Sequence, residues 1–362
     1  MKTLNLELTK NMSITKAILL VGGEGTRLRP LTLSTPKPML PLAGYPITAH
    51  QIAKLAAVGI TEVMLATSYR TEVFADWLAQ QDYLDLQIKF AIEEVPLGTG
   101  GAIRNAADHL NLSDDESVVV LNGDVLSGHD LTQQLTQYAA AKAAASLHLV
   151  SVADPSSFGL VPTSDTGKVL AFLEKPESAA EITTNQINAG CYILHRDVIN
   201  QISQGVPSSV ERDVFPALLA TKAKVIGYLD NTYFLDLGTP YSYVQGSADL
   251  VTGKVSSPLI TKAAQAVIHP TAKVDPSAMV FGGSVVMAAA EISAGAVVSG
   301  SIIFENAKID LNSQLFDSIL GRNSKINSDL ILTKIVVAEN CTINTDIPAG
   351  VRVWPNMELT TN

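Results

Sequence analysis

Residues able to bind phosphate gather near the start of the chain. An apolar run at 17–21, expected as a buried strand, leads into a glycine-rich turn. This turn supplies the first candidate phosphate-binding residues: Gly22, Gly23, Gly25, Thr26 and Arg27. Glycines let the backbone approach a phosphate closely, and the planar donors of Arg27 match phosphate oxygens. Lys37, between two prolines, adds a second cation, so these residues together describe a site for a polyphosphate.

The turn differs from the two common glycine-rich nucleotide loops, Gly-x-Gly-x-x-Gly and Gly-x-x-x-x-Gly-Lys-Ser/Thr. A glycine turn alone could equally connect a strand to a helix. The full string Gly-Gly-Glu-Gly-Thr-Arg-Leu-Arg-Pro-Leu-Thr, with Pro-Lys-Pro-Met-Leu-Pro after it, resembles the signature of the sugar-nucleotide pyrophosphorylases. The residues of this string are most similar to those of the mannose-1-phosphate guanylyltransferase branch of that family.

Two aspartates each follow an apolar stretch and precede turn residues. Asp124 stands in Leu-Asn-Gly-Asp-Val, and Asp236 stands in Phe-Leu-Asp-Leu-Gly-Thr-Pro. A single aspartate in such a place is commonly a helix cap or a turn residue. A pair suits Mg²⁺, which takes one or two carboxylates together with phosphate oxygens and water. The family resemblance implies that Asp124 and Asp236 hold the catalytic magnesium.

A second group of residues points to a sugar phosphate. Glu174 and Lys175 stand in Phe-Leu-Glu-Lys-Pro, where an isolated pair would usually be a solvated surface pair. The resemblance implies that Lys175 holds the sugar phosphate and that Glu174 hydrogen-bonds sugar hydroxyls. It also implies that Asn188, in Asn-Ala-Gly-Cys-Tyr, and Gly159, in Phe-Gly-Leu-Val, line the hexose pocket.

A second glycine-rich loop, Pro-Leu-Gly-Thr-Gly-Gly-Ala, contains Gly98 and Gly101 and leads into an expected helix. Read alone, it is a helix start. The resemblance implies that both glycines let the loop pack against the nucleotide base. The motif Ser68-Tyr69 and residues 210–216 also resemble guanylyltransferase elements, with roles that are less clear.

These motifs need a scaffold, which the hydrophobic pattern predicts. From 17 to about 152, apolar strands alternate with helical segments. This indicates parallel strands covered by helices on both faces, a doubly wound Rossmann-like α/β sheet. Ligands bind beyond the carboxyl ends of such strands, where the first glycine turn and Asp124 stand. Residues 153–252 are less regular, and we expect a nucleotidyltransferase domain over 14–252.

The pattern changes after a joint at 253–258. Apolar residues then recur every six positions from Ile268 to Val298, and the period resumes after one-residue slips at Ile303 and Leu320. Such hexapeptide repeats predict a left-handed parallel β-helix, whose coils stack because none can bury its inner face alone. An ordinary β-sandwich is the alternative. We assign 253–362 to this domain and expect it to mediate self-association into a homo-oligomer.

The composition of the chain disfavours some classes of binding partner. The 362 residues carry a formal net charge of −10, which disfavours nucleic acid or an anionic membrane as the main partner. Two cysteines and six histidines form no metal-ligand pattern, as expected of a cytoplasmic protein without structural zinc. Residues 1–13 lack the apolar core of a signal peptide and are expected to be a disordered leader.

These residues predict an enzyme that forms a nucleoside diphosphate sugar and pyrophosphate from an NTP and a sugar-1-phosphate. The resemblance favours GTP and mannose-1-phosphate, with Mg²⁺ as the cofactor. It implies this catalytic set: Arg27, Lys37, Asp124, Lys175 and Asp236. Thymidylyl, uridylyl or adenylyl transfer to glucose-1-phosphate is the alternative within the same chemistry. A non-catalytic regulatory paralogue that binds sugar nucleotide is the alternative outside it, and the complete charged set disfavours it.

Overall fold

The computed structural model describes most of the chain, in four stretches: residues 14–67, 71–78, 86–176 and 178–360. Two sequence predictions fall outside these stretches. They are the leader at 1–13 and the motif Ser68-Tyr69. Within the four stretches, no helix is both long enough and apolar enough to span a membrane.

The chain forms two compact units that do not follow chain order. The first unit combines the residues up to Gly23 with 51–234, and the second combines 24–50 with 235–362. Residues 235–252, which the sequence analysis assigns to the first domain, thus belong with the C-terminal repeats. So does the short segment that carries Arg27 and Lys37. The signature motif is therefore divided, because its first two glycines belong to the first unit and its cations to the second.

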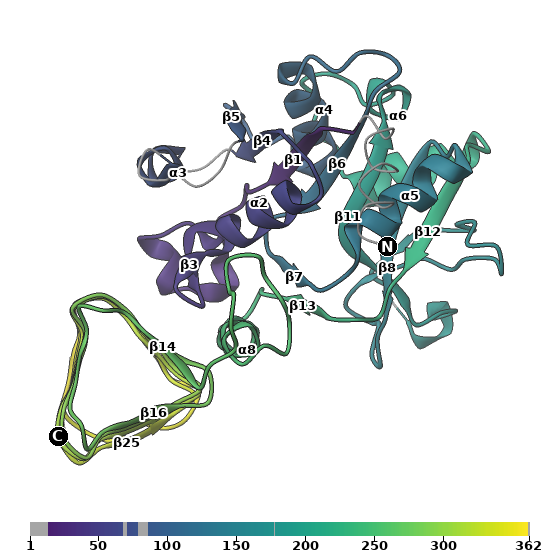
Figure 1. Ribbon diagram of the computed structural model, residues 1–362. Coiled ribbons are helices and arrows are strands. Elements are labelled where there is room, and N and C mark those ends of the chain that lie inside the picture. The colour runs from purple at the N-terminus through teal and green to yellow at the C-terminus, as the bar shows by residue number, and fades with distance from the viewer. Residues whose placement is uncertain (1–13, 68–70, 79–85, 177, 361–362) are drawn as a thin grey trace. The chain divides into compact units, whose positions relative to one another are not determined.

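A nine-stranded sheet is the centre of the first unit (Figure 1). Its main path runs β10-β9-β11-β6-β1-β4-β5, and β8 lies beside β11 with β12 next to it. The strands are β1 (Lys16–Leu20), β4 (Glu62–Thr67), β5 (Gln87–Ile92), β6 (Ser117–Asn122), β8 (Ala145–Ser151), β9 (Gly159–Leu160), β10 (Leu173–Glu174), β11 (Gln186–His195) and β12 (Val225–Leu229). Strands β1, β4, β5 and β6 are parallel, as predicted.

Strand β11, from the less regular region after residue 152, makes the sheet mixed. It runs antiparallel to both β6 and β8, between which it is inserted. The chain that leaves β6 returns to the sheet as β8, which is not adjacent to β6. The later strand β11 occupies the position between β6 and β8. An apolar run records that both faces of a strand are buried, but it does not record the direction of the strand.

Helices cover the sheet because its central strands are apolar on both faces. The helices of this part of the chain are α2 (Ile47–Ala57), which continues across the two units, α3 (Thr71–Leu78), α4 (Gly98–His109), α5 (Leu131–Ala141), α6 (Arg196–Asn200) and α7 (Phe215–Ala220). Ile18 and Val120 pack in one core with Ile103 of α4, while Leu19 is equally buried on the opposite face of β1. Alternate side chains of one strand thus enter two different cores.

His148 on β8 is expected from its alternating strand to be a satisfied sheet histidine rather than a catalyst. Its ring is fully buried and stacks on that of His129, with 3.9 Å between the centroids. The Nε2 atom lies 3.3 Å from the carbonyl oxygen of Asp230, whereas Nδ1 has no hydrogen-bond partner among the described residues. Burial lowers the pKa of His148 to about 4, so the ring is neutral at pH 7. It is buried in the sheet as predicted, but only half of its hydrogen-bonding capacity is used.

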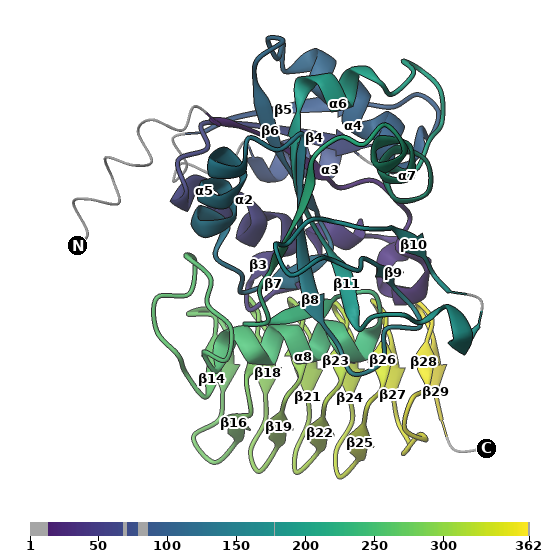
Figure 2. The ribbon, with the colours of Figure 1, turned by 90° about the vertical axis from the view of Figure 1, so that its right-hand side faces the viewer.

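A parallel β-helix forms most of the second unit. Its coils have a triangular cross-section (Figure 1) and lie side by side from β14 to β29 (Figure 2). The predicted inward residues from Val286 to Ile343 form its core, which excludes the β-sandwich and fits the left-handed hexapeptide type. Helix α8 (Pro240–Val251) packs against β17, where Gly283 lets the coil approach Ala248.

The strands of the β-helix form three parallel sheets. The first contains β14 (Ala266–Ile268), β17 (Ser284–Val286), β20 (Ile302–Ile303), β23 (Ile319–Leu320), β26 (Val336–Val337) and β28 (Arg352–Val353). The second contains β15 (Lys273–Val274), β18 (Glu291–Ile292), β21 (Lys308–Ile309), β24 (Lys325–Ile326), β27 (Thr342–Ile343) and β29 (Glu358–Leu359). The third contains β16 (Met279–Phe281), β19 (Val297–Ser299), β22 (Gln314–Phe316) and β25 (Ile331–Thr333).

The one-residue slips in the hexad period have a structural cause. Lys273 and Glu291 are cross-strand partners 18 residues apart, which is three full hexads. Later coils contain 17 residues, as in the pair Ser301 and Ser318. Because a 17-residue coil omits one position from three hexads, the apolar period shifts by one in each coil. The sequence predicts only a fragment near the end, but β28 and β29 continue the stack.

Side-chain ladders satisfy the polar groups at the corners of the coils. One ladder consists of asparagines in successive coils, with amide-to-amide hydrogen bonds of 3.0 to 3.2 Å and left-handed backbone: Asn306, Asn323, Asn340 and Asn356. Asparagine tolerates that backbone better than most residues. Buried serines form a second ladder, in which the Ser301 hydroxyl accepts from the Ser318 amide of the next coil at 3.1 Å. The corners are thus stabilised by hydrogen bonds between successive coils.

Candidate active site

The signature segment of the second unit is built from three short turns. They are 3-10 helices: η1 (Thr26–Leu28), η2 (Leu31–Leu33) and η3 (Lys37–Met39). Gly25 enters η1 with a left-handed φ of 59°, and a β-carbon there would lie 2.8 Å from Cβ of Lys37. Only glycine lets the turn and Lys37 pack this closely. The Thr32 hydroxyl donates to the Gly25 carbonyl oxygen at 3.0 Å and closes the segment on itself.

Arg27, Lys37 and Asp236 meet in this unit although they are far apart in sequence. Arg27 Nη2 lies 3.6 Å from Asp236 Oδ2, and Lys37 Nζ lies 3.9 Å from Asp236 Oδ1. The side chain of Arg27 is 66% exposed, whereas Lys37 is buried. A buried ammonium is a fixed charge, while an exposed guanidinium can reach a ligand. Two cations around one carboxylate leave a local excess of positive charge, which suits a phosphate.

Gly238 stands in the motif Phe-Leu-Asp-Leu-Gly-Thr-Pro and is a site residue that was not predicted from the sequence. A β-carbon at this position would lie 2.5 Å from Arg27 Nη2 and 2.9 Å from Asp236 Oδ1. The guanidinium of Arg27 therefore rests against the bare backbone of residue 238. The sequence feature that could have indicated Gly238 is its position two residues after Asp236, the candidate metal-binding aspartate.

We expect Gly238→Ala to lower kcat by about tenfold with little loss of stability, because the added methyl group displaces only side-chain ends, the exposed guanidinium of Arg27 and the Asp236 carboxylate beside it. Steady-state kinetics and a thermal unfolding curve of the purified variant check this. In an Arg27→Ala background the same substitution should cause a smaller loss, since the guanidinium, which lies nearest to the added methyl group, is then absent. A full tenfold loss in that background would contradict the assignment.

In the first unit, the two predicted strand ends lie at one edge of the sheet. Gly22 and Gly23 follow β1, and Asp124 follows the adjacent parallel strand β6. The backbone N–H of Gly123 donates to the Leu20 carbonyl oxygen at 2.9 Å, and a β-carbon on Gly123 would lie 2.6 Å from that oxygen. The structure thus brings Asp124 next to the start of the glycine turn, as expected at the carboxyl ends of parallel strands.

Gly159 and Glu174 are direct partners across the antiparallel pair β9 and β10. A β-carbon on Gly159 would lie 2.6 Å from Glu174 Oε2, so the glycine makes room for the carboxylate. Burial raises the pKa of Glu174, and the Glu211 carboxylate adds to the rise. Lys175 Nζ lies 3.9 Å from the Glu174 carboxylate on a side chain that is 69% exposed. The site therefore presents a partly desolvated acid beside an accessible cation.

Asn188 lies where strand β11 bulges, since its register with β8 shifts between Asn188 and Tyr192. Asn188 Nδ2 donates to the Tyr192 hydroxyl at 2.7 Å, and Asn188 Oδ1 accepts from the Gly190 amide at 3.1 Å. Gly190 has a left-handed φ of 72°, and a β-carbon there would lie 2.8 Å from Asn122 Nδ2. Both ends of the Asn188 amide are held, and each end keeps one further hydrogen-bonding position.

The glycines of the second loop make close contacts within the protein itself. A β-carbon on Gly98 would lie 2.5 Å from the Ser208 carbonyl oxygen, and one on Gly101 would lie 3.0 Å from the Val206 carbonyl oxygen. The backbone N–H of Gly100 donates to that same Ser208 oxygen at 2.9 Å. The chain at 206–208 therefore already requires small residues at the start of α4, independently of any contact to a base.

Thr99 and Glu211 form a contact that sequence reasoning missed. The Thr99 hydroxyl donates to Glu211 Oε2 at 2.8 Å and accepts from the Val210 amide at 2.9 Å. Residues 210–214 form η5, a single π-helical turn (Val210–Val214). The motif at 210–216, whose role was unclear, thus fastens the second glycine loop. In the sequence, the contact was indicated only by a charged motif at 210–216 that resembles the family but had no assigned role.

Two family models match the chain in consecutive regions. The one described as Nucleotidyl transferase matches residues 16–253, and the GMPPB C-terminal domain matches residues 263–362. A mannose-1-phosphate guanylyltransferase of Mycobacterium tuberculosis is 50% identical over 281 residues, which cover 77% of each chain. A mannose-1-phosphate guanyltransferase of Candida albicans is 36% identical, over 72% of this chain and 73% of the relative.

A solved structure shares the fold of the nucleotidyltransferase region. The crystal structure of HddC from Yersinia pseudotuberculosis, complexed with GMP-PN, superimposes with a TM-score of 0.54 at 27% identity. The match covers 65% of this chain and 98% of that chain. Because the family model spans well over half of the residues and a relative of 50% identity spans 77% of them, the chain belongs to the nucleotidyl transferase family.

Proposed function

We propose that this protein forms GDP-mannose and pyrophosphate from GTP and mannose-1-phosphate. The observation that carries the proposal is the cluster in which Arg27 and Lys37 surround Asp236 on the signature segment. Relatives that are 50% and 36% identical to this chain bear the name of this activity. A nucleotidyltransferase of this kind needs an NTP and a sugar phosphate, and both are anions that such a cluster can hold.

The reaction is an in-line displacement at the α-phosphorus of the triphosphate. A phosphate oxygen of the sugar-1-phosphate forms the new P–O bond, and the bond to the β-phosphate breaks as pyrophosphate leaves with the electron pair. The protein supplies no nucleophile, so catalysis consists of positioning and of stabilising the charge on the phosphate oxygens.

Arg27 would bind the leaving pyrophosphate, because its guanidinium is exposed and its donors match two phosphate oxygens at once. Lys37 would contact the triphosphate as a fixed charge. Further nucleotide contacts are assigned to the glycine turn and the second loop. Backbone groups of the turn would bind phosphates and those of the loop would border the base: Gly22, Gly23, Gly25, Thr26, Gly98 and Gly101.

The sugar side would be formed by the residues around β9, β10 and the β11 bulge. Lys175 would hold the phosphate of the sugar, because its side chain is accessible. Glu174 and Asn188 would hydrogen-bond hexose hydroxyls, each from a position that the surrounding chain already holds. Gly159 would line the hexose pocket by making room for the Glu174 carboxylate.

Enzymes of this family use a divalent metal, and we propose that it is Mg²⁺ held by Asp124 and Asp236. The fit rests on Asp236 Oδ1, a buried oxygen that accepts no hydrogen bond from the described residues. Such an oxygen suits a hard cation. Mg²⁺ commonly uses only one or two carboxylates, and the described residues contain no group of three or more metal-ligating side chains. When bound, the cation would neutralise charge on the phosphates.

We place the reaction in the cytoplasm and propose a homo-oligomer joined through the β-helix. Cys191 and Cys341 are each buried as free thiols, in keeping with a reducing compartment. Exposed apolar side chains on β-helix strands, Met279, Phe281 and Ile331, are of the kind that self-association covers.

Pyrophosphate release with Mg²⁺, measured for four NTPs against mannose-1-phosphate and glucose-1-phosphate, tests the proposed reaction. We expect turnover with GTP and mannose-1-phosphate. Turnover with a different pair alone would retain the chemistry and replace the substrates. A folded sample that binds a sugar nucleotide but turns over none of the pairs would overturn the proposal in favour of a regulatory paralogue.

A further inference from the structure

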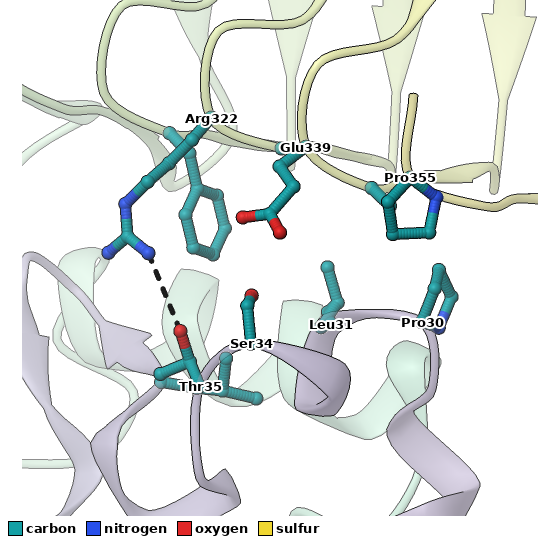
Figure 3. A pocket seen from close by; sticks show the side chains of 11 residues that line it. Pro30, Leu31, Ser34, Thr35, Arg322, Glu339 and Pro355 are labelled. Carbon is teal, nitrogen blue, oxygen red and sulfur yellow. Dashed lines mark hydrogen bonds between the residues drawn. The ribbon is translucent and has the colours of Figure 1, made fainter. Parts of the chain in front are cut away.

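Two arginines of the β-helix contact the backbone and side chains of the signature segment within the second unit. Arg352 Nη1 donates to the carbonyl oxygens of Arg27 at 2.9 Å and Arg29 at 2.7 Å. Arg322 Nη1 donates to the Thr35 hydroxyl at 3.4 Å (Figure 3). Residues more than 280 positions further along the chain thus contact both ends of the stretch from Arg27 to Thr35.

The contacted stretch has little regular structure to stabilise it. The turns η1 and η2 are single 3-10 turns of three residues each, and their i to i+3 hydrogen bonds have poorer geometry than those of an α-helix. The end of such a turn leaves carbonyl oxygens without a partner in the turn. Arg352 donates to two of these oxygens, on either side of Leu28. An element outside the turn therefore determines where its backbone lies.

Arg322 supports the other end of the stretch from a fixed position. Its Nε donates to Glu305 at 2.9 Å, and its guanidinium lies 5.7 Å from the centre of the Phe304 ring. In Figure 3 the side chains of Glu339 and Leu31 lie in the recess between the two chain segments, and Pro355 faces Pro30. Side chains of successive coils thus face the stretch along its length.

The Arg352 contact bears on the chemistry because one of its acceptors belongs to Arg27 itself. The Arg27 side chain is mostly exposed, and its far end contacts Asp236, at 3.6 Å, and the backbone of Gly238. Its position therefore depends on where its own backbone is held. A planar guanidinium can donate to two neighbouring oxygens from one fixed orientation, which fits the pair of carbonyl groups.

We propose that Arg352 is a positioning residue for pyrophosphate departure: it fixes the backbone at Arg27, so that the last coils of the β-helix take part in the catalytic arrangement. The proposal rests on the proposed function for its kinetic consequence, but the clamp on the backbone can be tested without turnover. Arg352 touches neither substrate nor phosphate and acts through Arg27.

The test uses the full-length protein and three variants: Arg352→Ala, Arg352→Lys and, as a matched control, Lys308→Ala. Lys308 is an exposed β-helix cation paired with Glu291 at 3.0 Å. Arg352→Ala should lower kcat roughly tenfold while KM for the sugar phosphate stays within about twofold, because only the phosphate-binding segment is displaced. Arg352→Lys keeps a donor and a charge and should recover part of the loss. Lys308→Ala should match the wild type.

Hydrogen exchange measured by mass spectrometry over residues 24–36 gives the second readout. We expect faster exchange in Arg352→Ala and wild-type exchange in Lys308→Ala, with thermal midpoints close to that of the wild type. Unchanged exchange, or wild-type kcat in Arg352→Ala, would overturn the proposal while leaving the function intact. Absence of turnover in the wild type would refute the proposed function, and the exchange comparison would still decide whether Arg352 holds the segment.

Discussion

Arg27→Ala is expected to lower kcat by roughly 10²–10³, the range found when an enzyme loses one donor that stabilises transition-state charge. The guanidinium is exposed, lies beside Asp236 and rests on the backbone of Gly238, so its removal leaves no buried group unpaired. Stability should therefore change little. Single-turnover measurements of pyrophosphate release, in the forward direction and with saturating substrates, isolate the step concerned.

Arg29→Ala is the matched control for that experiment. Arg29 stands two residues further along the same motif, but its side chain pairs with Glu24 at 2.8 Å on the exposed surface. Surface pairs of this kind contribute little, and the substitution keeps the backbone carbonyl that Arg352 contacts. Its kcat should stay near the wild-type value. A variant of Arg27 within twofold of wild type, or equal losses in both variants, would remove Arg27 from the mechanism.

Asp236→Asn is expected to lower kcat/KM by roughly 10³, because one substitution removes the counter-charge of two cations and a proposed ligand of the metal. Asparagine has almost the same shape, so the fold around Gly238 should be retained. The loss should depend on the metal concentration, with activity saturating only at higher Mg²⁺ than in the wild type. Initial rates measured over a Mg²⁺ series at fixed GTP check this.

The control is Asp310→Asn, in the same unit. Asp310 pairs with Lys325 at 2.7 Å and has a similar exposure, 29% against 33% for Asp236. It lies on the β-helix, outside the proposed site, and its variant should keep both kcat/KM and the Mg²⁺ requirement. If Asp236→Asn loses activity with an unchanged Mg²⁺ dependence, Asp236 acts only by holding Arg27 and Lys37, and the metal assignment at this residue is wrong.

Much of the chemistry could be predicted from the sequence because it depends on local strings. The glycine turn with Arg27, and the strand end before Asp124, are sets of neighbouring residues whose types match phosphate or a cation. The β-helix could also be predicted from the sequence, since an inward-facing apolar residue at every sixth position is a local repeat. Even the 17-residue coils appear in the sequence as slips of one position.

Contacts between distant parts of the chain could not be predicted in this way. The residues around Gly238 do not show that this glycine supports the Arg27 guanidinium. Those around position 98 do not show that the chain at 206–208 leaves room only for a glycine there. The apolar pattern of β11 does not show that this strand is antiparallel to β6. Each depends on where the fold places a segment that is remote in sequence.

The sequence alone thus predicts which groups would bind phosphate, sugar and metal, since such predictions depend on residue types in short strings. How Arg27 is held depends on the tertiary structure, because the carbonyl oxygens of Arg27 and Arg29 accept hydrogen bonds from Arg352, which lies 325 and 323 residues away. The pattern of side chains in a sequence predicts which groups are buried or charged. It does not predict the hydrogen-bond partner of a backbone oxygen, because that partner depends on how the whole chain folds.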